Sequence, residues 1–418
     1  MKTEWIRNPS QEDIRRGGEI IKNGGLVAFP TETVYGLGGD ALQADSSMKI
    51  YAAKGRPSDN PLIVHICRME DLSVIAEDIP DIAHRLAEKF WPGPLTMILK
   101  KSSRVPKETT GGLSTVAVRF PNHEVALALI REAGGFIAAP SANTSGRPSP
   151  TVGKYVYEDL DGRVDMILDG GDSAIGLEST IVDLTENVPV VLRPGFITLE
   201  QLCGIAPQTI LDPALAANVI TGPGADPAVA AKDITTAEAE KQITRSDEQI
   251  NTDSPTPDES CLVDRQASGK EKENGLHPKA PGMKYRHYAP KGMLTIIGGS
   301  SEKVSICLLN ELKKDKTQGY RTGVIVTKGL SGQKEGQTDG PADDREEKTG
   351  EANEEWTDYA DSIKVTEDMA HDLFRFLREF DDELIEKMYA PALEETGLGL
   401  AVMNRLKKAA GGRVIKAD

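Results

Sequence analysis

The amino-acid sequence predicts an α/β protein with two domains. Short apolar runs alternate with helical patterns through residues 1–205, and the same alternation returns in residues 292–330 and 357–418. Between these regions, residues 223–279 are polar and show no sustained period. The length of 418 residues agrees with this division, since a domain usually takes about 100–200 residues.

The first domain is predicted to open with a helix at residues 10–24. Ser10 is a typical N-cap, Asp13 completes a pair resembling a capping box, and Gly24 ends the helix. Two further helices are predicted at 80–90 and 123–133. Strands are predicted at 26–30, 61–66, 95–101, 114–121, 136–143, 165–171, 179–185 and 189–194. Several of these runs are apolar without alternation, which indicates a sheet covered on both faces.

The second domain is predicted to be a small parallel sheet. Strands at 293–299, 320–327 and 361–366 are separated by helices at 301–316 and 367–383, and the segment 397–416 follows. The stretches 223–279 and 331–356 are read as disordered insertions because their composition buries too little apolar surface to offset the entropy of ordering. The predicted division is therefore 1–205, a linker at 206–291, and 292–418.

Composition excludes several classes of protein. The net charge of −16 argues against binding nucleic acid through bulk positive charge. The four cysteines have no metal-binding spacing, so no protein-held metal is predicted. The N-terminus has no apolar signal core, and no run approaches the ~18 apolar residues of a membrane span. These features predict a cytoplasmic protein that does not contact the membrane.

Three common catalytic motifs are absent or misplaced. Residues 36–41, GLGGDA, fit G-x-G-x-x-A, but PTETVY separates them from the strand that should precede a dinucleotide-binding turn. No G-x-x-x-x-G-K-[ST] loop is present, so any ATP that the protein bound would not be held by a Walker motif. No G-x-S-x-G elbow is present to indicate a serine nucleophile.

Six polar clusters lie at the ends of predicted strands, where open α/β sheets bind ligands. They are PTETVYGLG (30–38), KGRPSDNPLIVH (54–65), STVAVRFP (114–121), APSANTSGRPSPT (139–151), GLESTIVDLT (176–185) and LRPG (192–195). Each cluster alone is also consistent with a turn or a solvated loop. Four of them contain an arginine, and Arg119 interrupts an apolar strand, so it needs an anionic partner from the protein or from a ligand.

Together the clusters predict a cleft for a highly anionic small molecule. Cations, hydroxyls and glycine-rich turns are the groups that bind phosphate and ribose. No catalytic dyad stands out, which favours catalysis by positioning and charge neutralisation, as in phosphoryl or nucleotidyl transfer.

These motifs, with PGPLT at 92–96 and in this order, closely resemble the YrdC-type threonylcarbamoyl-AMP synthase family. The resemblance covers about residues 10–200, and the C-terminal domain after the HYAP segment resembles the long, two-domain form. It implies a twisted mixed sheet around a positively charged cavity. It also implies the condensation of L-threonine, bicarbonate and ATP to threonylcarbamoyl-AMP and pyrophosphate. The resemblance further implies that the product serves modification of the adenosine beside the anticodon in tRNA.

The resemblance also implies roles for individual residues. L-threonine is expected at Thr33, His65, Arg119, Ala139 and Ser179. ATP is expected at Arg56, Asn60, Thr115, Ser141, Asn143, Ser149, Arg193, Tyr285 and His287. Lys54 and Arg56 are the predicted catalytic residues. Mg²⁺ is expected to accompany ATP, and the expected partners are tRNA-modification proteins, with weak or no direct binding of nucleic acid.

Residues 280–290, APGMKYRHYAP, combine cations and aromatic side chains between Pro281 and Pro290. They are either a solvated start to the second domain or a lid that closes over the nucleotide. Two other functions remain possible at this point: an RNA-binding module, and a related carbamoyl-adenylate-forming enzyme of hydrogenase maturation. The long acidic insertions depart from the family pattern, and the absence of Cys-rich motifs argues against the hydrogenase-related enzyme.

Overall fold

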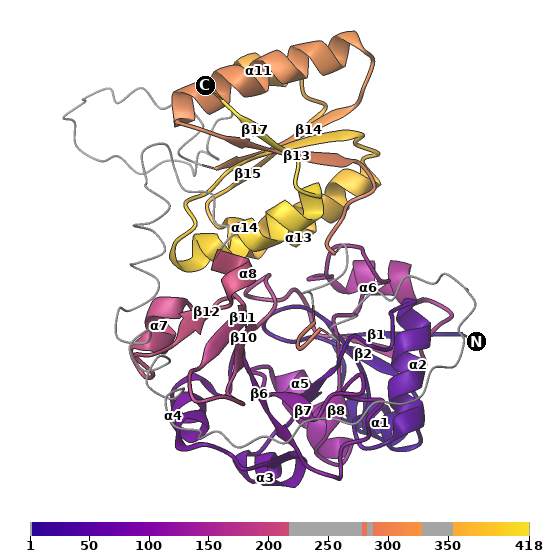
Figure 1. The fold of residues 1–418 in the computed structure, drawn as a ribbon. Coiled ribbons are helices and arrows are strands. Elements are labelled where there is room, and N and C mark those ends of the chain that lie inside the picture. The colour runs from indigo at the N-terminus through magenta and orange to yellow at the C-terminus, as the bar shows by residue number, and fades with distance from the viewer. Residues whose placement is uncertain (1, 217–277, 282–286, 328–353, 418) are drawn as a thin grey trace, which may run out of the picture.

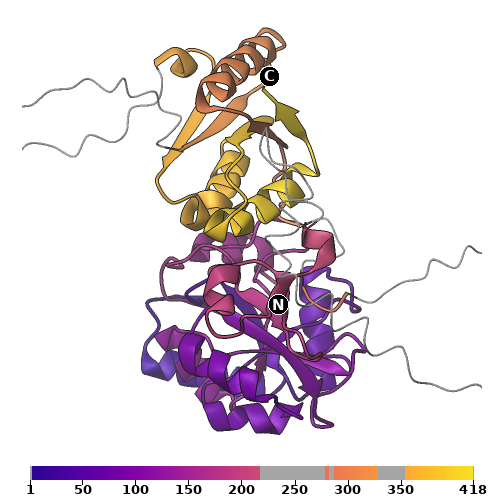
Figure 2. The same cartoon turned by 60° about the vertical axis from the view of Figure 1, so that its left-hand side comes forward.

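The computed structural model describes residues 2–216, 278–281, 287–327 and 354–417. These residues form two α/β domains, with the smaller one stacked on the larger (Figure 1). In the smaller domain, a sheet lies between α11 (Ser301–Thr317) on one side and α13 (Met369–Asp382) with α14 (Gly397–Ala410) on the other. Figure 2 shows from a second direction that α13 and α14 face the larger domain.

The larger domain is built on a mixed sheet of 12 strands, which confirms the expected fold. The strand order is β1-β9-β2-β3-β8-β4-β7-β6-β10-β11-β12, and β5 pairs with β6. The strands are β1 (Glu4–Arg7), β2 (Val27–Phe29), β3 (Gly36–Asp40), β4 (Ile63–His65), β5 (Ala76–Glu77), β6 (Leu95–Lys101), β7 (Thr115–Arg119), β8 (Ile137–Ala138), β9 (Met166–Asp169), β10 (Thr180–Asp183), β11 (Val190–Arg193) and β12 (Ile210–Leu211).

Helices cover this sheet, in agreement with its continuous apolar strands. They are α1 (Gln11–Lys22), α2 (Ala44–Lys54), α3 (Leu72–Ile75), α4 (Asp81–Phe90), α5 (Glu124–Glu132), α6 (Gly153–Leu160), α7 (Leu199–Cys203) and α8 (Pro213–Ala216), with a 3₁₀ turn at Met69–Asp71. The capping box predicted for α1 is present: the Ser10 side chain accepts from the Asp13 amide, and the Asp13 carboxylate accepts from the Ser10 amide.

Three differences from the predicted elements have clear causes. Residues 36–40, GLGGD, form strand β3, which is absent from the predicted set, and two of these glycines leave room for Phe29 and Ile137 where a Cβ would collide or crowd. β12 joins the sheet after residue 205, so the first domain continues beyond the expected boundary. In the second domain, α12 (Glu354–Thr357) begins within the predicted insertion 331–356, and Trp356 of this helix is buried in the core.

The smaller sheet has five strands, all paired in parallel, as predicted. Its order is β15-β14-β16-β13-β17, with β13 (Met293–Gly298), β14 (Thr322–Thr327), β15 (Ser362–Thr366), β16 (Lys387–Pro391) and β17 (Val414–Lys416). The central strand β16 is missing from the predicted set. Its sequence, KMYAP, is short and ends in proline, so it gives little strand signal by itself.

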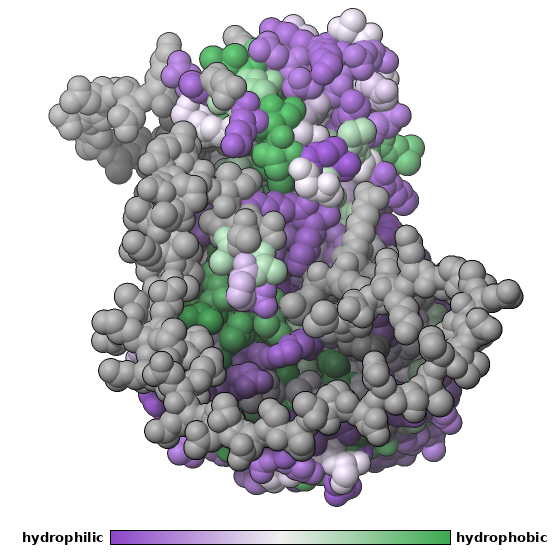
Figure 3. Space-filling model, viewed as in Figure 1, coloured by the Kyte–Doolittle hydropathy of each residue, from purple (hydrophilic) through white to green (hydrophobic). Residues whose placement is uncertain are grey.

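The segment 278–281 returns to the larger domain. Ala280 is fully buried against Ile181 and Leu192, on the face of the sheet that β10 and β11 form. Figure 3 shows hydrophobic residues gathered over these strands. No helix in the described part of the chain is both long and apolar enough to cross a membrane.

Candidate active site

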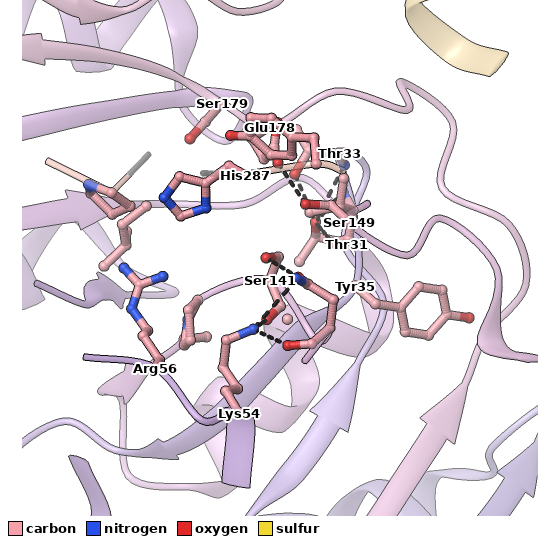
Figure 4. A pocket seen from close by; sticks show the side chains of 18 of the residues that line it. Thr31, Thr33, Tyr35, Lys54, Arg56, Ser141, Ser149, Glu178, Ser179 and His287 are labelled. Carbon is pink, nitrogen blue, oxygen red and sulfur yellow. Dashed lines mark hydrogen bonds between the residues drawn. The ribbon is translucent and has the colours of Figure 1, made fainter. Parts of the chain in front are cut away.

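A hollow with about 730 Å³ of empty space, including its open mouth, lies in the larger domain beneath the second one. Its described lining brings together most residues of the predicted site: Thr33, Lys54, Arg56, His65, Arg119, Ala139, Ser141, Asn143, Ser149, Ser179, Arg193 and His287. Asn60 and Thr115 lie outside this lining, and Tyr285 lies outside the described residues. Figure 4 shows side chains converging on the hollow from several loops.

Arg119 lies at the end of β7 and has a protein partner. Its guanidinium forms an ion pair of 2.8 Å with the buried carboxylate of Glu32 and donates to Thr33 Oγ1 at 2.8 Å. Sequence reasoning required an anion here, and Glu32 supplies it from the PTETVYG loop. The ion pair holds the Arg119 guanidinium in one orientation, in which the side chain forms part of the lining of the hollow.

His65 lies directly beside Arg119 because β4 and β7 pair in parallel with these two residues in register. The His65 Nδ1 lies 3.1 Å from the carbonyl oxygen of Ile63. Since a carbonyl only accepts, Nδ1 carries the proton of the neutral ring. Burial, followed by the positive charge of Arg119, lowers the pKa of His65 to about 3. The imidazole is therefore neutral at physiological pH.

Lys54 ends α2, where Gly55 adopts φ 61° and reverses the chain. The ammonium donates to the carbonyl oxygens of Ser141 and Asn143, so it ties α2 to the turn after β8 (Figure 4). Burial, then the nearby Arg56 charge, lowers the pKa of Lys54 well below its usual value. These contacts place Lys54 at the wall of the hollow as a support for the turn.

Two more guanidinium groups face the hollow. Arg56 donates to the carbonyl oxygens of Asn60 at 3.3 Å and Pro61 at 3.1 Å. Arg193 donates to the carbonyl oxygen and hydroxyl of Ser179, at 3.0 and 3.1 Å. Burial lowers the pKa of each arginine to about 10, so both remain charged near neutral pH.

Glu178 is the main feature that sequence reasoning missed. It lines the hollow and is buried; its Oε1 accepts from the Ser149 hydroxyl at 2.6 Å, and its Oε2 accepts from Arg405 Nε at 3.1 Å. Burial by itself raises the pKa of a carboxyl, but Arg405, Arg193 and the Ser149 hydroxyl hold the pKa of Glu178 below its usual value. The sequence signal that could have identified Glu178 as a site residue is its position next to Ser179 in the GLEST motif.

The end of the linker reaches the same hollow through Pro281, His287 and Tyr288. The His287 ring projects between Arg56 and the Glu178–Ser179 segment (Figure 4). Burial, followed by the charges of Arg56 and Lys408, lowers the pKa of His287 to about 4. Its Nε2 is buried and has no hydrogen-bond partner among the described residues. An unpartnered ring nitrogen in this position is available to a ligand.

Comparison with known proteins matches both halves of the chain to family models. Residues 19–195 match the Sua5/YciO/YrdC model, described as "Telomere recombination". Residues 236–411 match the model described as "Threonylcarbamoyl-AMP synthase, C-terminal domain".

Similar full-length proteins share both halves. The chain is 41% identical to the threonylcarbamoyl-AMP synthase of Pyrococcus abyssi over 96% of this chain and 95% of the relative. It is 39% identical to that of Bacillus subtilis over 100% of both. The crystal structure of P. abyssi Sua5 complexed with L-threonine superposes with a TM-score of 0.74 at 38% identity, covering 100% of both chains.

Proposed function

The chain belongs to the Sua5/YciO/YrdC family, in its two-domain threonylcarbamoyl-AMP synthase form, and we propose that it makes threonylcarbamoyl-AMP. The substrates are L-threonine, bicarbonate and ATP, and the second product is pyrophosphate. The observation that carries this proposal is the convergence of four arginines on one hollow of a protein whose net charge is −16: Arg56, Arg119, Arg147 and Arg193. Such a concentration of guanidinium groups suits a carboxylate and a triphosphate bound together.

L-threonine binds at the end of the hollow lined by β4, β7 and the PTETVYG loop. Arg119 holds its carboxylate, while the hydroxyls of Thr33 and Ser179, the neutral His65 and the backbone at Ala139 contact its polar groups. The Arg119–Glu32 ion pair supports this role, since it fixes the guanidinium before the ligand arrives. The P. abyssi relative, whose fold is similar, binds L-threonine.

ATP binds across the other residues of the hollow. Arg56 and Arg193 neutralise the phosphates, and Ser141, Asn143, Ser149 and His287 offer hydrogen-bonding groups. Asn60 and Thr115 do not line the hollow. They support ATP binding indirectly, Asn60 through the loop that follows Arg56 and Thr115 through strand β7. Tyr285 lies outside the described residues, and its contact with ATP stays a prediction.

The reaction needs no protein nucleophile. The threonine nitrogen attacks the bicarbonate carbon, and water leaves as the carbamate forms. A carbamate oxygen then attacks the α-phosphorus of ATP, the bond to the bridging oxygen of the β-phosphate breaks, and pyrophosphate leaves. Arg56 stabilises the charge that develops on the phosphates, and Lys54, at the end of α2, holds the turn of Ser141 and Asn143 that lines the hollow. The side chains thus act by positioning reactants and neutralising charge.

The described residues do not fit a protein-held Mg²⁺. Glu178 is the only acidic side chain among the described residues that line the hollow, and it is already bound to Arg405 and Ser149. No group of three or more His, Cys, Asp or Glu side chains suited to a metal occurs in the described parts of the chain. Mg²⁺ would therefore enter with ATP as part of the substrate.

The product carries a mixed anhydride, so a second enzyme must accept its threonylcarbamoyl group. We infer that this acceptor system modifies the adenosine next to the anticodon in tRNA and that the partner proteins belong to it. The acidic charge of the chain agrees with transfer through a small-molecule product and not through a large contact with RNA.

The test is an assay of pyrophosphate release from ATP by the full-length protein. Release that depends on both L-threonine and bicarbonate is expected, with threonylcarbamoyl-AMP identified by mass spectrometry. Omission of either substrate is the internal control. Turnover independent of threonine, or salt-sensitive RNA binding without any turnover, contradicts the proposal.

A further inference from the structure

Loops that line the hollow rest directly on the second domain. Val34 and Leu177, from two of these loops, belong to the same apolar cluster as Leu373 and Phe374 of α13. A third loop meets α13 through the Pro148 carbonyl, which accepts two hydrogen bonds from Arg378. The second domain is therefore the support for one wall of the hollow (Figure 1).

The loop that precedes Glu178 lies against the backbone of α13. Gly176 adopts φ +79°, and a Cβ added there would lie 2.2 Å from the carbonyl oxygen of His371. Such an approach leaves no space for a side chain, so the loop and the helix meet backbone to backbone. The position of Glu178 thus depends on where the second domain sits.

Arg405 of α14 enters the larger domain and is fully buried. Its Nε donates to the Glu178 carboxylate at 3.1 Å, its Nη2 to the Glu178 carbonyl oxygen at 3.4 Å, and its Nη1 to the carbonyl oxygen of Pro194. These contacts join Glu178 to the LRPG loop that follows Arg193. One side chain of the second domain therefore links two loops of the site.

The carboxylate of Glu178 poses a problem for a site that binds a polyanion. A buried negative charge in the wall would repel phosphate groups strongly, since the surroundings screen it poorly. The same carboxylate also orients the Ser149 hydroxyl through its Oε1. Arg405 neutralises the charge while leaving Oε1 free to hold Ser149.

We propose that Arg405 is a positioning residue of the nucleotide site, which acts through Glu178 by neutralising its charge and orienting its carboxylate towards Ser149. The proposal rests on the proposed function, because it assigns the hollow to ATP. Arg405 does not line the hollow, so it acts on the nucleotide through the loops that it contacts, and its ion pair with Glu178 is the charged one of these contacts. The second domain thereby contributes to ATP binding without touching ATP.

The experiment compares four full-length variants by steady-state kinetics. Arg405→Met removes the cation while keeping the length of the side chain. Arg405→Met with Glu178→Gln also removes the charge that Arg405 neutralises, and the new amide keeps an oxygen for the Ser149 hydroxyl. Arg405→Lys keeps the charge. Lys364→Met, which breaks the pairs with Glu379 and Glu383, is the matched control in the second domain.

Arg405→Met is expected to raise KM for ATP by at least about tenfold, with kcat and KM for threonine within about threefold of wild type. The double variant is expected to recover most of the loss in KM, and Arg405→Lys and Lys364→Met are expected to stay within about threefold. A residue needed only for packing would lower the amount of folded enzyme, and removal of the Glu178 charge would not reverse that. Should Arg405→Met fail to fold, Arg405→Gln has the same expectation, because it also removes the charge.

Wild-type KM for ATP in Arg405→Met overturns the proposal. So does a raised KM that Glu178→Gln does not reverse. Calorimetric titration with a non-hydrolysable ATP analogue separates this result from the proposed function. If the wild type shows no threonine-dependent turnover but Arg405→Met still weakens binding of the analogue, the proposed function fails and the coupling through Glu178 stands.

Discussion

At the scale of single residues, two charged side chains that line the hollow have a buried partner of opposite charge within the protein. Arg119 pairs with Glu32, and Glu178 pairs with Arg405. Truncating one member of such a buried pair leaves the other without compensation, which costs more than the pair contributes. Variants in this site therefore need controls that separate lost ligand contacts from lost stability.

Arg56→Ala and Arg119→Ala are each expected to lower kcat/KM by at least about tenfold. Each variant removes a charge-assisted contact to the substrates worth about 1.5–3 kcal/mol. Arg56→Ala should lower kcat/KM for ATP, and Arg119→Ala should lower kcat/KM for L-threonine. Pyrophosphate release, with each substrate varied in turn, measures both constants.

Lys100→Ala is the matched control for Arg119→Ala. Lys100 lies on β6, which pairs with β7, and forms an exposed ion pair with Asp78. Its removal should leave both kinetic constants unchanged. Wild-type turnover in Arg56→Ala and Arg119→Ala would contradict the assignment of the site.

His65 makes stability depend on pH in a defined direction. Its folded pKa of about 3 lies below the usual value of 6.5, so the unfolded chain binds a proton before the native protein does. The contribution of His65 to the free energy of unfolding is fully present above pH 6.5. It falls as the pH decreases towards 3, by about 1.4 kcal/mol per pH unit.

His65→Gln should therefore reduce the slope of unfolding free energy against pH between these values. Denaturant unfolding at a series of pH values measures that slope. The control is His84→Gln at an exposed position of α4, which should leave the His65 contribution in place. An unchanged slope in His65→Gln would show that the imidazole is not held neutral in the fold.

At the scale of elements, α13 and α14 join the two domains through buried arginines. Arg378 of α13 donates to both oxygens of Asp159 on α6, at 3.0 and 2.8 Å, and both side chains are fully buried. Arg147 adds ion pairs with Asp159 and with Asp381 of α13. The interface is thus specified by charge as well as by apolar packing.

Arg378→Met is expected to lower the free energy of unfolding by about 3–5 kcal/mol, because Asp159 would lose a buried partner. Arg375→Met is the matched control on the same helix. Arg375 pairs with Asp372 near the surface, and such a pair contributes about 0–1 kcal/mol. Chemical denaturation measures both variants, and equal losses would mean that the Arg378–Asp159 pair does not stabilise the interface.

The helices and strands that could be predicted from the sequence are those whose capping residues and strand propensity lie within the element itself. The capping box of α1 and the strand β6 are determined by neighbouring residues, and both follow the prediction. β16 and β3 depend on their places in the sheets, since KMYAP and GLGGD have weak strand propensity. The strand-end clusters are likewise local, whereas Glu178 becomes a feature of the site only through a residue of the second domain.

At the scale of the whole molecule, the two domains share one apolar cluster. Val34, Leu177 and Tyr288 pack with the helices of the second domain. Interfaces between domains are often more polar and permit relative motion. A shared core predicts that these two domains unfold together.

Differential scanning calorimetry of the full-length protein is expected to show one transition. An ATP analogue should move that whole transition upwards, because the ligand binds only the folded state and the two domains are coupled. A nucleoside without phosphates, added at the same concentration as the analogue, serves as the control. Two transitions, of which only one responds to the analogue, would contradict the coupling.

The sequence by itself determined the α/β class, the two-domain organisation and the family of the chain. It also indicated most of the residues that line the hollow, because strand propensity, turn chemistry and motif order are local properties. Only the tertiary structure decided which charges compensate one another. Glu178 and Arg405 are 227 residues apart, and their contact exists because α14 packs against the loops of the first domain. Pairings over such separations depend on the packing of the whole molecule, which no local pattern encodes.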